Sequence, residues 1–326
     1  MKTTDIKKRE IANQLIESMK TAGTNFMLPW VKSGMPTNLG RLGTKNPYYY
    51  GINNLILWRE KNYRNYKSNV WGTFKQVNDK GGQVLKGEHG VDVILWKPFE
   101  VSDTYKRNGS GHKAGDSYQK TCFYIRFFKV FNMDQTTLKD DYAPNKNVEG
   151  AKTKVDVEQY IANTKAVIKH GGDRCYYVPS QDYIQMVEKS DFNTTVESNA
   201  TQNYYSTLLH ELTHWTGHEK RCKRDMQGYF GDDSYAFEEL VAEIGAAVQC
   251  CILGITSSPK KESAQYLNSW IKRIENDPDA LFKASAKASS AVKFIEGLQE
   301  NKKQIVKDPE LKADKNKVAW IQKVSA

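Results

Sequence analysis

The chain has 326 residues, of which 39% are hydrophobic and 11% aromatic. This apolar content excludes a largely disordered chain, and the length favours two domains over one. The longest apolar stretch, 240–255, is interrupted by Glu243 and Gln249, which indicates a buried helix and no membrane span. The N-terminus lacks the apolar region of a signal peptide, and the five cysteines form no C-x-x-C pair. We therefore expect a cytoplasmic protein without disulfides and without a membrane partner.

The net charge of +10 is unevenly distributed along the chain. Residues 1–150 contain 24 lysines and arginines against 14 acidic residues, whereas residues 151–326 contain 24 of each. The whole positive excess therefore lies in the N-terminal half. Such asymmetry is expected when one domain meets a polyanion and the other performs separate work, although a charge that serves solubility alone is an equal alternative.

The pattern of the N-terminal half predicts a mixed α/β domain. An amphipathic helix around Ile6–Met19 ends at Leu28-Pro29-Trp30, and a loop rich in glycine and proline follows. The remaining predicted elements are a helix at 52–64, strands within 70–99 including an apolar strand at 91–96, a flexible insertion at 102–120 and an aromatic strand at 122–131.

The C-terminal half reads as mostly helical with a small sheet. Apolar residues thin out at 144–154, which we interpret as the linker between domains 1–145 and 146–326. The elements predicted after it are helices at 155–169, 201–215 and 237–253, a short strand at 174–178, and two helices that start at Pro259 and Pro278 behind the caps Ser258 and Asp277. The fold class is therefore α+β, in two domains.

The strongest chemical signal is the segment His210-Glu211-Leu212-Thr213-His214. On a helix, residues i and i+4 lie on one face, so both imidazoles can bind one zinc ion. Glu211 follows the first histidine and is placed to act as general base on a water molecule. A catalytic zinc needs a third protein ligand and one open position, whereas a purely structural zinc takes four Cys or His ligands.

The third ligand must come from elsewhere in the chain. The metzincin spacing requires a histidine at the position of Lys220, so that pattern fails. His218 shares the face of the two ligands but follows Gly217, where the helix is expected to end, so we assign it a hydrogen-bonding role. Glu239, within a later helix, is the preferred ligand. This arrangement is that of the gluzincins.

Two further carboxylates accompany Glu239 on the same predicted helix. Glu243 lies one turn beyond it and can accept the free ring N–H of a ligand histidine. Glu238 points about 100° away from Glu239, so we expect it to face solvent or a salt bridge.

Three long segments of the chain are HELTHWTGHEKRCKR (210–224), YAFEELVAEIGAA (235–247) and CYYVPSQDYIQM (175–186). Together with shorter segments spread over nearly the whole chain, they resemble one known family, the ArdC-type antirestriction proteins of mobile genetic elements. Shorter matches are Leu28-Pro29-Trp30, Tyr50-Gly51-Ile52-Asn53 and Trp71-Gly72-Thr73-Phe74. Two positions depart from the family pattern, Val187 in place of proline and Arg221-Cys222 in place of Arg-Leu, and neither is a proposed ligand.

The resemblance implies a single-stranded-DNA-binding domain followed by a zincin-like metallopeptidase domain. It also implies a role in conjugation and related transfer, the protection of incoming DNA from host restriction. A host restriction or DNA-processing protein is then a further candidate partner.

Single-strand binding without sequence preference uses a basic groove and aromatic side chains on which bases stack. The first half has both kinds of residue close together. Tyr48 and Tyr49 are the preferred stacking residues because they follow a glycine-rich loop and have no periodic apolar pattern. The basic residues that we expect beside them are Arg41, Lys45, Arg64 and Lys75.

Two functions remain open from the sequence. The first is a DNA-tethered zinc peptidase, in which Glu211 accepts a proton, His218 or Tyr235 stabilises the oxyanion, and the strand Tyr176–Val178 pairs with the substrate. The second is a DNA-shielding protein whose zincin domain is structural or only vestigially active. The presence of a general base favours the first.

Overall fold

The computed structural model describes residues 3–23, 34–104, 113, 115–143, 156–226, 233–256 and 261–299. The predicted helix end at Leu28-Pro29-Trp30, the helix start at Ser258 and Pro259, and the whole linker predicted at 144–154 lie outside these residues. The position of the domain boundary therefore stays a prediction.

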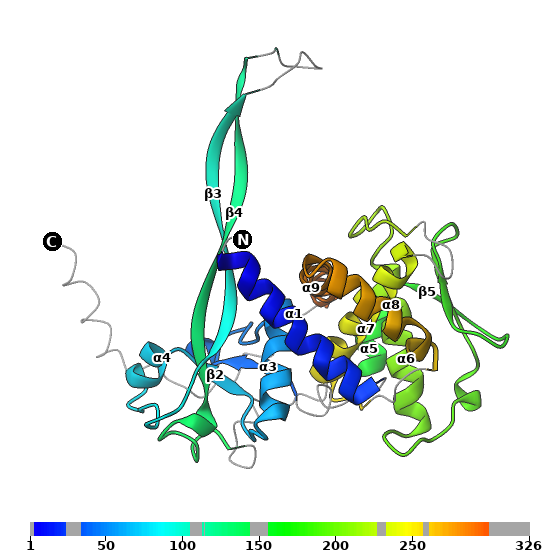
Figure 1. Ribbon diagram of the computed structural model, residues 1–326. Helices are drawn as coiled ribbons and strands as arrows, with labels where there is room; N and C mark the ends of the chain where they lie inside the picture. Colours follow the sequence, from blue (N-terminus) through cyan, green and yellow to red (C-terminus); the bar gives the residue numbers. More distant parts are fainter. Residues whose placement is uncertain are drawn as a thin grey trace, which may run out of the picture.

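The N-terminal half is built on a four-stranded sheet with the strand order β1-β2-β4-β3 (Figure 1). β1 and β2 are parallel, and the other two pairings are antiparallel. The elements of this half are α1 (Thr3–Ala22), β1 (Thr37–Asn38), η2 (Leu39–Arg41), α3 (Ile52–Tyr63), β2 (Val70–Gly72), α4 (Phe74–Asp79), β3 (Val91–Thr104), β4 (Ser117–Asn132) and η3 (Met133–Gln135).

The region predicted as strands between 70 and 99 contains a helix as well. Thr73 caps α4: its side chain accepts a hydrogen bond from the backbone N–H of Gln76, and the Gln76 side chain accepts one from the backbone N–H of Thr73. This reciprocal capping box satisfies two backbone donors at the start of the helix. The T-x-x-Q signature was present in the sequence, but the short α4 was missed because only Val77 is buried.

The hairpin of β3 and β4 is longer than predicted and projects from the body of the protein (Figure 1). Its register runs without interruption from Val91↔Val130 to Thr104↔Ser117. The flexible insertion predicted at 102–120 is thus wrong at both ends, where 102–104 and 117–120 are strand. Polar residues there alternate on a solvated ribbon, a pattern that composition alone cannot distinguish from a loop. Residues 105–112 and 114 lie outside the described part of the chain.

The C-terminal half combines helices with a three-stranded sheet of order β5-β7-β6. Its elements are α5 (Val157–Ala162), β5 (Val167–His170), β6 (Tyr176–Val178), β7 (Tyr183–Met186), η4 (Lys189–Asp191), α6 (Ala200–Trp215), α7 (Asp233–Leu253), α8 (Lys261–Asn276) and α9 (Asp279–Gly297).

The helix predicted at 155–169 is in fact a short helix and a strand. α5 stops at Ala162, and Lys165 has a positive φ of 57°, which a continuing helix does not allow. The residues that follow pair in parallel with β7. Val167 and Ile168 are β-branched, so tertiary pairing and strand propensity together outweigh the helical spacing.

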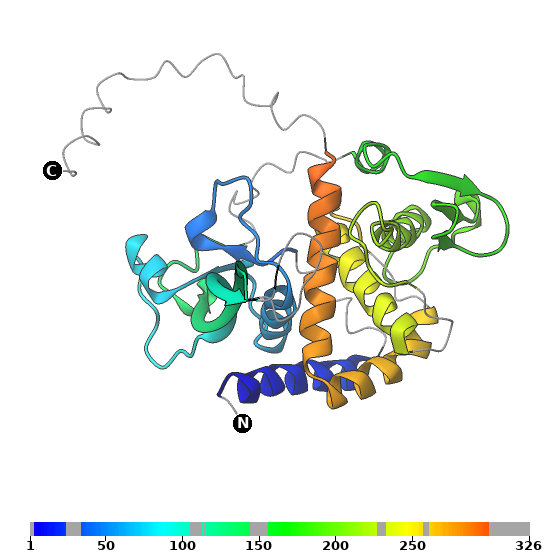
Figure 2. The ribbon, with the colours of Figure 1, turned by 90° about the horizontal axis from the view of Figure 1, so that it is seen from above.

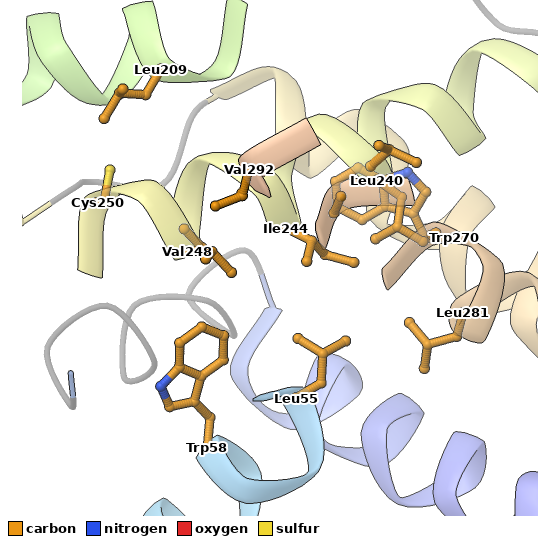
Figure 3. Close-up of a cluster of buried hydrophobic side chains, with 14 of the residues drawn as sticks. Leu55, Trp58, Leu209, Leu240, Ile244, Val248, Cys250, Trp270, Leu281 and Val292 are labelled. Carbon is orange, nitrogen blue, oxygen red and sulfur yellow. The ribbon is translucent and has the colours of Figure 1, made fainter. Parts of the chain in front are cut away.

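The two halves share one buried cluster. In Figure 2, α9 lies between the N-terminal elements and helices α6 and α7. Figure 3 shows Leu55 and Trp58 of α3 facing the same cluster as Leu240 of α7 and Trp270 of α8. Ion pairs from α1 to Glu275 and Asp279 hold that helix beside α8 and the start of α9. Among the described helices, none is long and apolar enough to cross a membrane.

Candidate metal centre

Helix α6 places His210, Glu211 and His214 at the centre of the C-terminal half. Asn199 begins the helix with a capping box that includes Gln202. Apolar residues at helical spacing, among them Leu208, Leu209 and Leu212, anchor α6 in the core, and the two histidines and Glu211 are themselves buried. Both imidazoles emerge on one face one turn apart, with ring centroids 4.8 Å from each other.

Helix α7 crosses α6 closely and brings Glu239 to the histidines. A Cβ on Gly245 would lie 2.6 Å from Cγ2 of Thr213, which is fully buried between the two histidines in the sequence. Only glycine therefore fits at this crossing. Gln249, one turn further along α7, donates a hydrogen bond of 2.9 Å to the Thr213 hydroxyl and fixes the register of the two helices.

Three potential ligand atoms converge between these helices. The Nε2 atoms of His210 and His214 are 3.2 Å apart, and the two oxygens of Glu239 lie 3.4 Å from the first and 3.3 Å from the second. In a tetrahedral zinc site each ligand atom is about 2.0–2.1 Å from the ion, so the ligand atoms are about 3.3 Å apart. The separations match this value, so the three residues fit a small divalent ion.

The outer nitrogens of both imidazoles face carboxylates. Oε1 of Glu238 lies 3.3 Å from Nδ1 of His214, and Oε1 of Glu243 lies 3.7 Å from Nδ1 of His210. Contact with a carboxylate at Nδ1 favours the tautomer that leaves Nε2 free for a metal. Glu243 lies near the ring nitrogen from which it was expected to accept, but 3.7 Å is longer than a hydrogen bond, and Nδ1 of His210 has no hydrogen-bond partner among the described residues. The role expected for Glu243 therefore stays a prediction.

Glu238 forms a salt bridge, which was one of the two environments expected for it, and it does so inside the protein. It is buried, not solvent-facing, and Arg224 donates hydrogen bonds to it at 2.7, 3.0 and 3.1 Å. Arg224 also donates to the backbone carbonyl of Thr213 and to the Thr216 hydroxyl. The sequence reasoning missed Arg224 altogether. The sequence did indicate that such a partner is needed, because a buried glutamate in the apolar stretch of α7 requires a cation beside it.

The charges of this cluster shift the pKa values of its members. Burial by itself lowers the pKa of His214, but the carboxylates of Glu239 and Glu238 outweigh burial and raise it to about 10. Burial raises the pKa of Glu239, and the charges of His214 and His210 outweigh that effect, so its pKa lies well below the ordinary range. Without an ion, the proton on the His214 imidazole thus offsets part of the negative charge of the acidic groups, and a divalent cation can take its place.

Glu211 differs from the other carboxylates of the site. It is buried on α6, and it makes no hydrogen bond or ion pair with any residue that the structure describes. Tyr235 lies one turn before Glu239 on α7, where burial and then the charge of Glu239 raise the pKa of its hydroxyl. The His218 ring is engaged on the loop after α6, where its Nδ1 accepts the backbone N–H of Lys220 at 3.2 Å.

The strand β6 is an edge of its sheet and packs beside α6. Arg221 ties this sheet to the end of α6. It donates to both oxygens of Asp182, to the Tyr177 hydroxyl at 3.1 Å and to the backbone carbonyl of Trp215 at 2.6 Å. Arg221 thus holds the sheet against the metal helix.

Of the two predicted DNA-stacking residues, Tyr49 is buried and Tyr48 is half-buried. Tyr49 is only 4% exposed, and its hydroxyl accepts a hydrogen bond of 2.9 Å from Asn38. Tyr48 packs against the shared core, where burial and then Glu296 of α9 raise the pKa of its hydroxyl. The expectation for Tyr49 is therefore corrected, because its ring is covered in this structure. The sequence could not show that α9 lies beside this loop.

The predicted basic residues are also engaged, with one exception. Arg41 donates a hydrogen bond of 2.6 Å to the backbone carbonyl of Tyr48. Arg64 pairs with Glu60 at 2.5 Å, and Lys75 pairs with Asp79 at 2.8 Å. Lys45 is exposed. The structure does not gather these residues with Tyr48 and Tyr49 into one open surface.

Two family models match the chain, one in each half. Residues 5–131 match the N-terminal domain of the anti-restriction factor ArdC, and residues 155–287 match a zincin-like metallopeptidase family. The interval between the two matches includes the predicted domain boundary.

Related proteins match over nearly the whole chain. An uncharacterized protein of Sinorhizobium fredii, y4eC, is 30% identical over 91% of this chain and 93% of its own length. The DNA primase TraC of Escherichia coli is 35% identical over 88% of this chain, which corresponds to only 26% of TraC.

Two solved structures of the antirestriction protein ArdC from plasmid R388 are similar to this fold. The metal-free structure has a TM-score of 0.68 at 31% identity and covers 90% of this chain and 97% of that one. The Mn(II)-bound structure has a TM-score of 0.66 at 30% identity and covers 90% and 98%. With an ArdC N-terminal domain, a zincin-like domain and this likeness over the full length, the chain belongs to the ArdC family of antirestriction proteins.

Proposed function

We propose that this protein is a zinc-dependent peptidase tethered to single-stranded DNA, and that it protects incoming DNA of a mobile element from host restriction. One observation carries the peptidase: His210, His214 and Glu239 converge at tetrahedral separations beside Glu211, the one carboxylate of the site that is not engaged with the protein. A structural metal site does not need a free buried carboxylate.

The chain's own residues can perform the remaining steps of peptide hydrolysis. When bound, zinc supplies Lewis-acid activation of water and of the peptide carbonyl. Glu211 accepts the proton of the attacking water and returns it to the leaving amine. The Tyr235 hydroxyl, whose raised pKa keeps it protonated, donates to the oxygen on which negative charge develops. His218 is the less favoured donor, because its Nδ1 already accepts the backbone N–H of Lys220 on the loop after α6.

The substrate backbone would lie along β6. This strand is at the edge of its sheet, and strand addition at such an edge orients a peptide by main-chain hydrogen bonds. Arg221 and Asp182 hold the strand in place against α6. The class of substrate expected is an extended segment of a protein, such as a host restriction or DNA-processing enzyme.

The N-terminal half would supply the tether. Its net charge is +10, whereas that of residues 151–326 is zero, and its family model is that of the ArdC N-terminal domain. A basic surface raises the local concentration of a polyanion and makes binding sensitive to salt. Because both halves share one core, we expect the peptidase site to stay close to the bound strand.

The substitution Glu211→Gln separates peptidase activity from DNA binding. The amide has nearly the same shape but cannot accept a proton, so cleavage should fall by about 10²–10⁴-fold. Casein with and without an oligo(dT) strand serves as the probe of proteolysis. Transfer of an unmodified plasmid into a restricting host measures protection, and both should be lost while zinc content and oligonucleotide binding are retained.

Glu219→Gln is the matched control, because Glu219 is exposed on the loop after α6. It should leave every readout unchanged. Full protection by Glu211→Gln would refute the peptidase mechanism and favour protection by occupancy of the DNA alone. Cleavage that survives in Glu211→Gln would show that the general base is another residue.

A further inference from the structure

The β3–β4 hairpin has two chemically different faces. In its uninterrupted antiparallel register, paired residues point to the same side, and successive residues alternate between sides. At the base of the hairpin, Val93 belongs to the small cluster around Trp71, whereas Ile94 belongs to the core shared by the two halves. Beyond these residues, no other element of the described chain pairs with either strand.

One outer face combines basic and aromatic side chains. We call it the basic face, and it consists of Leu95, Lys97, Phe99, Val101 and Asp103 of β3 with Tyr118, Lys120, Cys122, Tyr124 and Arg126 of β4. Phe99 and Tyr124 are 43% and 46% exposed, and their ring centroids lie 5.9 Å apart. From Leu95 to Asp103 this face extends about 26 Å, at roughly 3.3 Å per residue.

The cations of the basic face are available to a ligand. No carboxylate among the described residues forms an ion pair with Lys97, Lys120 or Arg126. The single acid on this face, Asp103, accepts a hydrogen bond from the Tyr118 hydroxyl at 3.3 Å. By register, the opposite outer face between Trp96 and Thr104 contains no lysine or arginine.

We propose that the basic face binds single-stranded DNA, with Lys97, Lys120 and Arg126 on phosphates and with Phe99 and Tyr124 stacking on bases. This inference rests on the single-strand binding proposed for the N-terminal half and locates it on the hairpin. Exposed aromatic rings interleaved with unpaired cations are the chemistry that single strands require, since a duplex hides its bases. Large apolar side chains on a projecting ribbon would otherwise be an aggregation hazard.

A second copy of this chain is a poorer occupant of the same surface. In a twofold arrangement the same patch meets itself, so three unpaired cations would face three unpaired cations. Like charges brought together at an interface disfavour association. A polyanion meets the same cations with complementary charge.

The test compares two triple variants of the full-length protein, which lose the same charge in the same half. The first is Lys97→Gln, Lys120→Gln and Arg126→Gln, and the second is Lys67→Gln, Lys80→Gln and Lys139→Gln, at exposed sites away from the hairpin. Binding of labelled oligo(dT) is measured over a series of salt concentrations. The hairpin triple should bind at least tenfold more weakly, with a salt slope reduced by about 2, since each phosphate contact on a single strand contributes about 0.7.

A second pair of variants tests stacking. Phe99→Ser with Tyr124→Ser should weaken oligo(dT) binding by about fivefold or more per ring, and should not weaken binding of an abasic strand of the same length. Phe74→Ser with Tyr63→Ser is the control, because those rings are also exposed in the N-terminal half. Circular dichroism and zinc content verify that each variant is folded.

The outcomes separate this inference from the proposed function. If the wild type binds no oligo(dT), the DNA-binding half of the proposed function fails. If the wild type binds and the two triples weaken binding equally, the proposed function stands and the hairpin site is refuted. A hairpin triple that binds DNA normally, but changes the sedimentation of the protein, would assign the basic face to self-association.

Discussion

The metal centre and the basic face of the hairpin differ in whether their charged side chains are paired within the protein. At the metal centre, the histidines and Glu238 are buried and each faces a group of opposite charge or a potential ligand. On the basic face, Lys97, Lys120 and Arg126 are matched by no acid in the described chain. A buried charge must be compensated within the protein, whereas water solvates an exposed charge, which therefore stays free to bind an external ligand.

The metal centre is therefore a pre-organised site, whereas the hairpin is an adaptable binding surface. Three helical ligands, held by a close helix crossing and outer carboxylates, keep their geometry before any ion arrives. A two-stranded ribbon is only marginally stable by itself and can adjust to a flexible strand. Substitutions at the metal centre should therefore have large and specific effects, and those on the surface should have smaller, additive ones.

The largest effect is expected from Glu239→Ala. Removing one of three ligands should reduce bound zinc from one ion per chain to a small fraction, as measured by elemental analysis after dialysis, because two histidines alone hold the ion weakly. His218→Ala should keep its zinc. The reverse result would show that His218 is the third ligand and that the convergence of Glu239 is incidental.

A smaller effect should follow from Glu238→Gln, which keeps the shape but removes the charge between Arg224 and His214. Loss of such an outer contact typically costs 10–100-fold in metal affinity, and we expect this range by competition with a chelating dye. Glu219→Gln controls for the lost surface charge. An unchanged affinity would mean that the carboxylate behind His214 does not orient the ring.

The charge compensation at the centre can be tested by pH in metal-free protein. The pKa of His214 is raised from 6.5 to about 10 in the fold, so the stability it contributes is complete below pH 6.5 and is lost as the pH rises toward 10. Zinc takes the place of the proton. The gain in melting temperature on adding zinc should therefore increase from pH 6.5 to 8.5, and a gain that shrinks would contradict the charge balance described above.

The smallest effect is expected for the double variant Arg64→Gln with Lys75→Gln. Both cations already pair with Glu60 and Asp79, so a phosphate would have to displace a carboxylate. Oligo(dT) binding should weaken by less than about threefold at physiological salt. A loss as large as that of the hairpin triple would restore these two residues as a principal part of the DNA surface.

The part of the metal site on α6 was predictable, because the positions of its side chains depend only on the spacing of residues within one helix. His210, Glu211 and His214 lie within five residues, and the helical period alone places the two imidazoles together. Glu239 could be proposed because it stands one turn from Glu243 on a later helix that can bring one carboxylate to the histidines. Arg224 could not, since its partnership with Glu238 depends on the path of the loop after α6.

For the proposed DNA-binding surface, the sequence predicted the kinds of residue, basic and aromatic, but not where on the fold they lie. Tyr48 and Tyr49 looked exposed because glycine surrounds them, but α9, more than 230 residues later, helps to cover their loop. The hairpin was interpreted as a strand followed by a flexible insertion, because polar residues at period two resemble a loop in composition. Its register with β4 is what places Lys97, Lys120 and Arg126 on one side.

The sequence by itself thus determined the α+β class, the division of charge between the halves, and the metal motif on α6, because these depend on composition or on spacing within one element. The tertiary structure alone decided the crossing of α6 and α7 at Gly245, the pairing of Arg224 with Glu238, and the small cluster around Trp71 in which Tyr49 is buried. Each of these depends on contacts between segments far apart in the chain, and no local periodicity encodes such contacts.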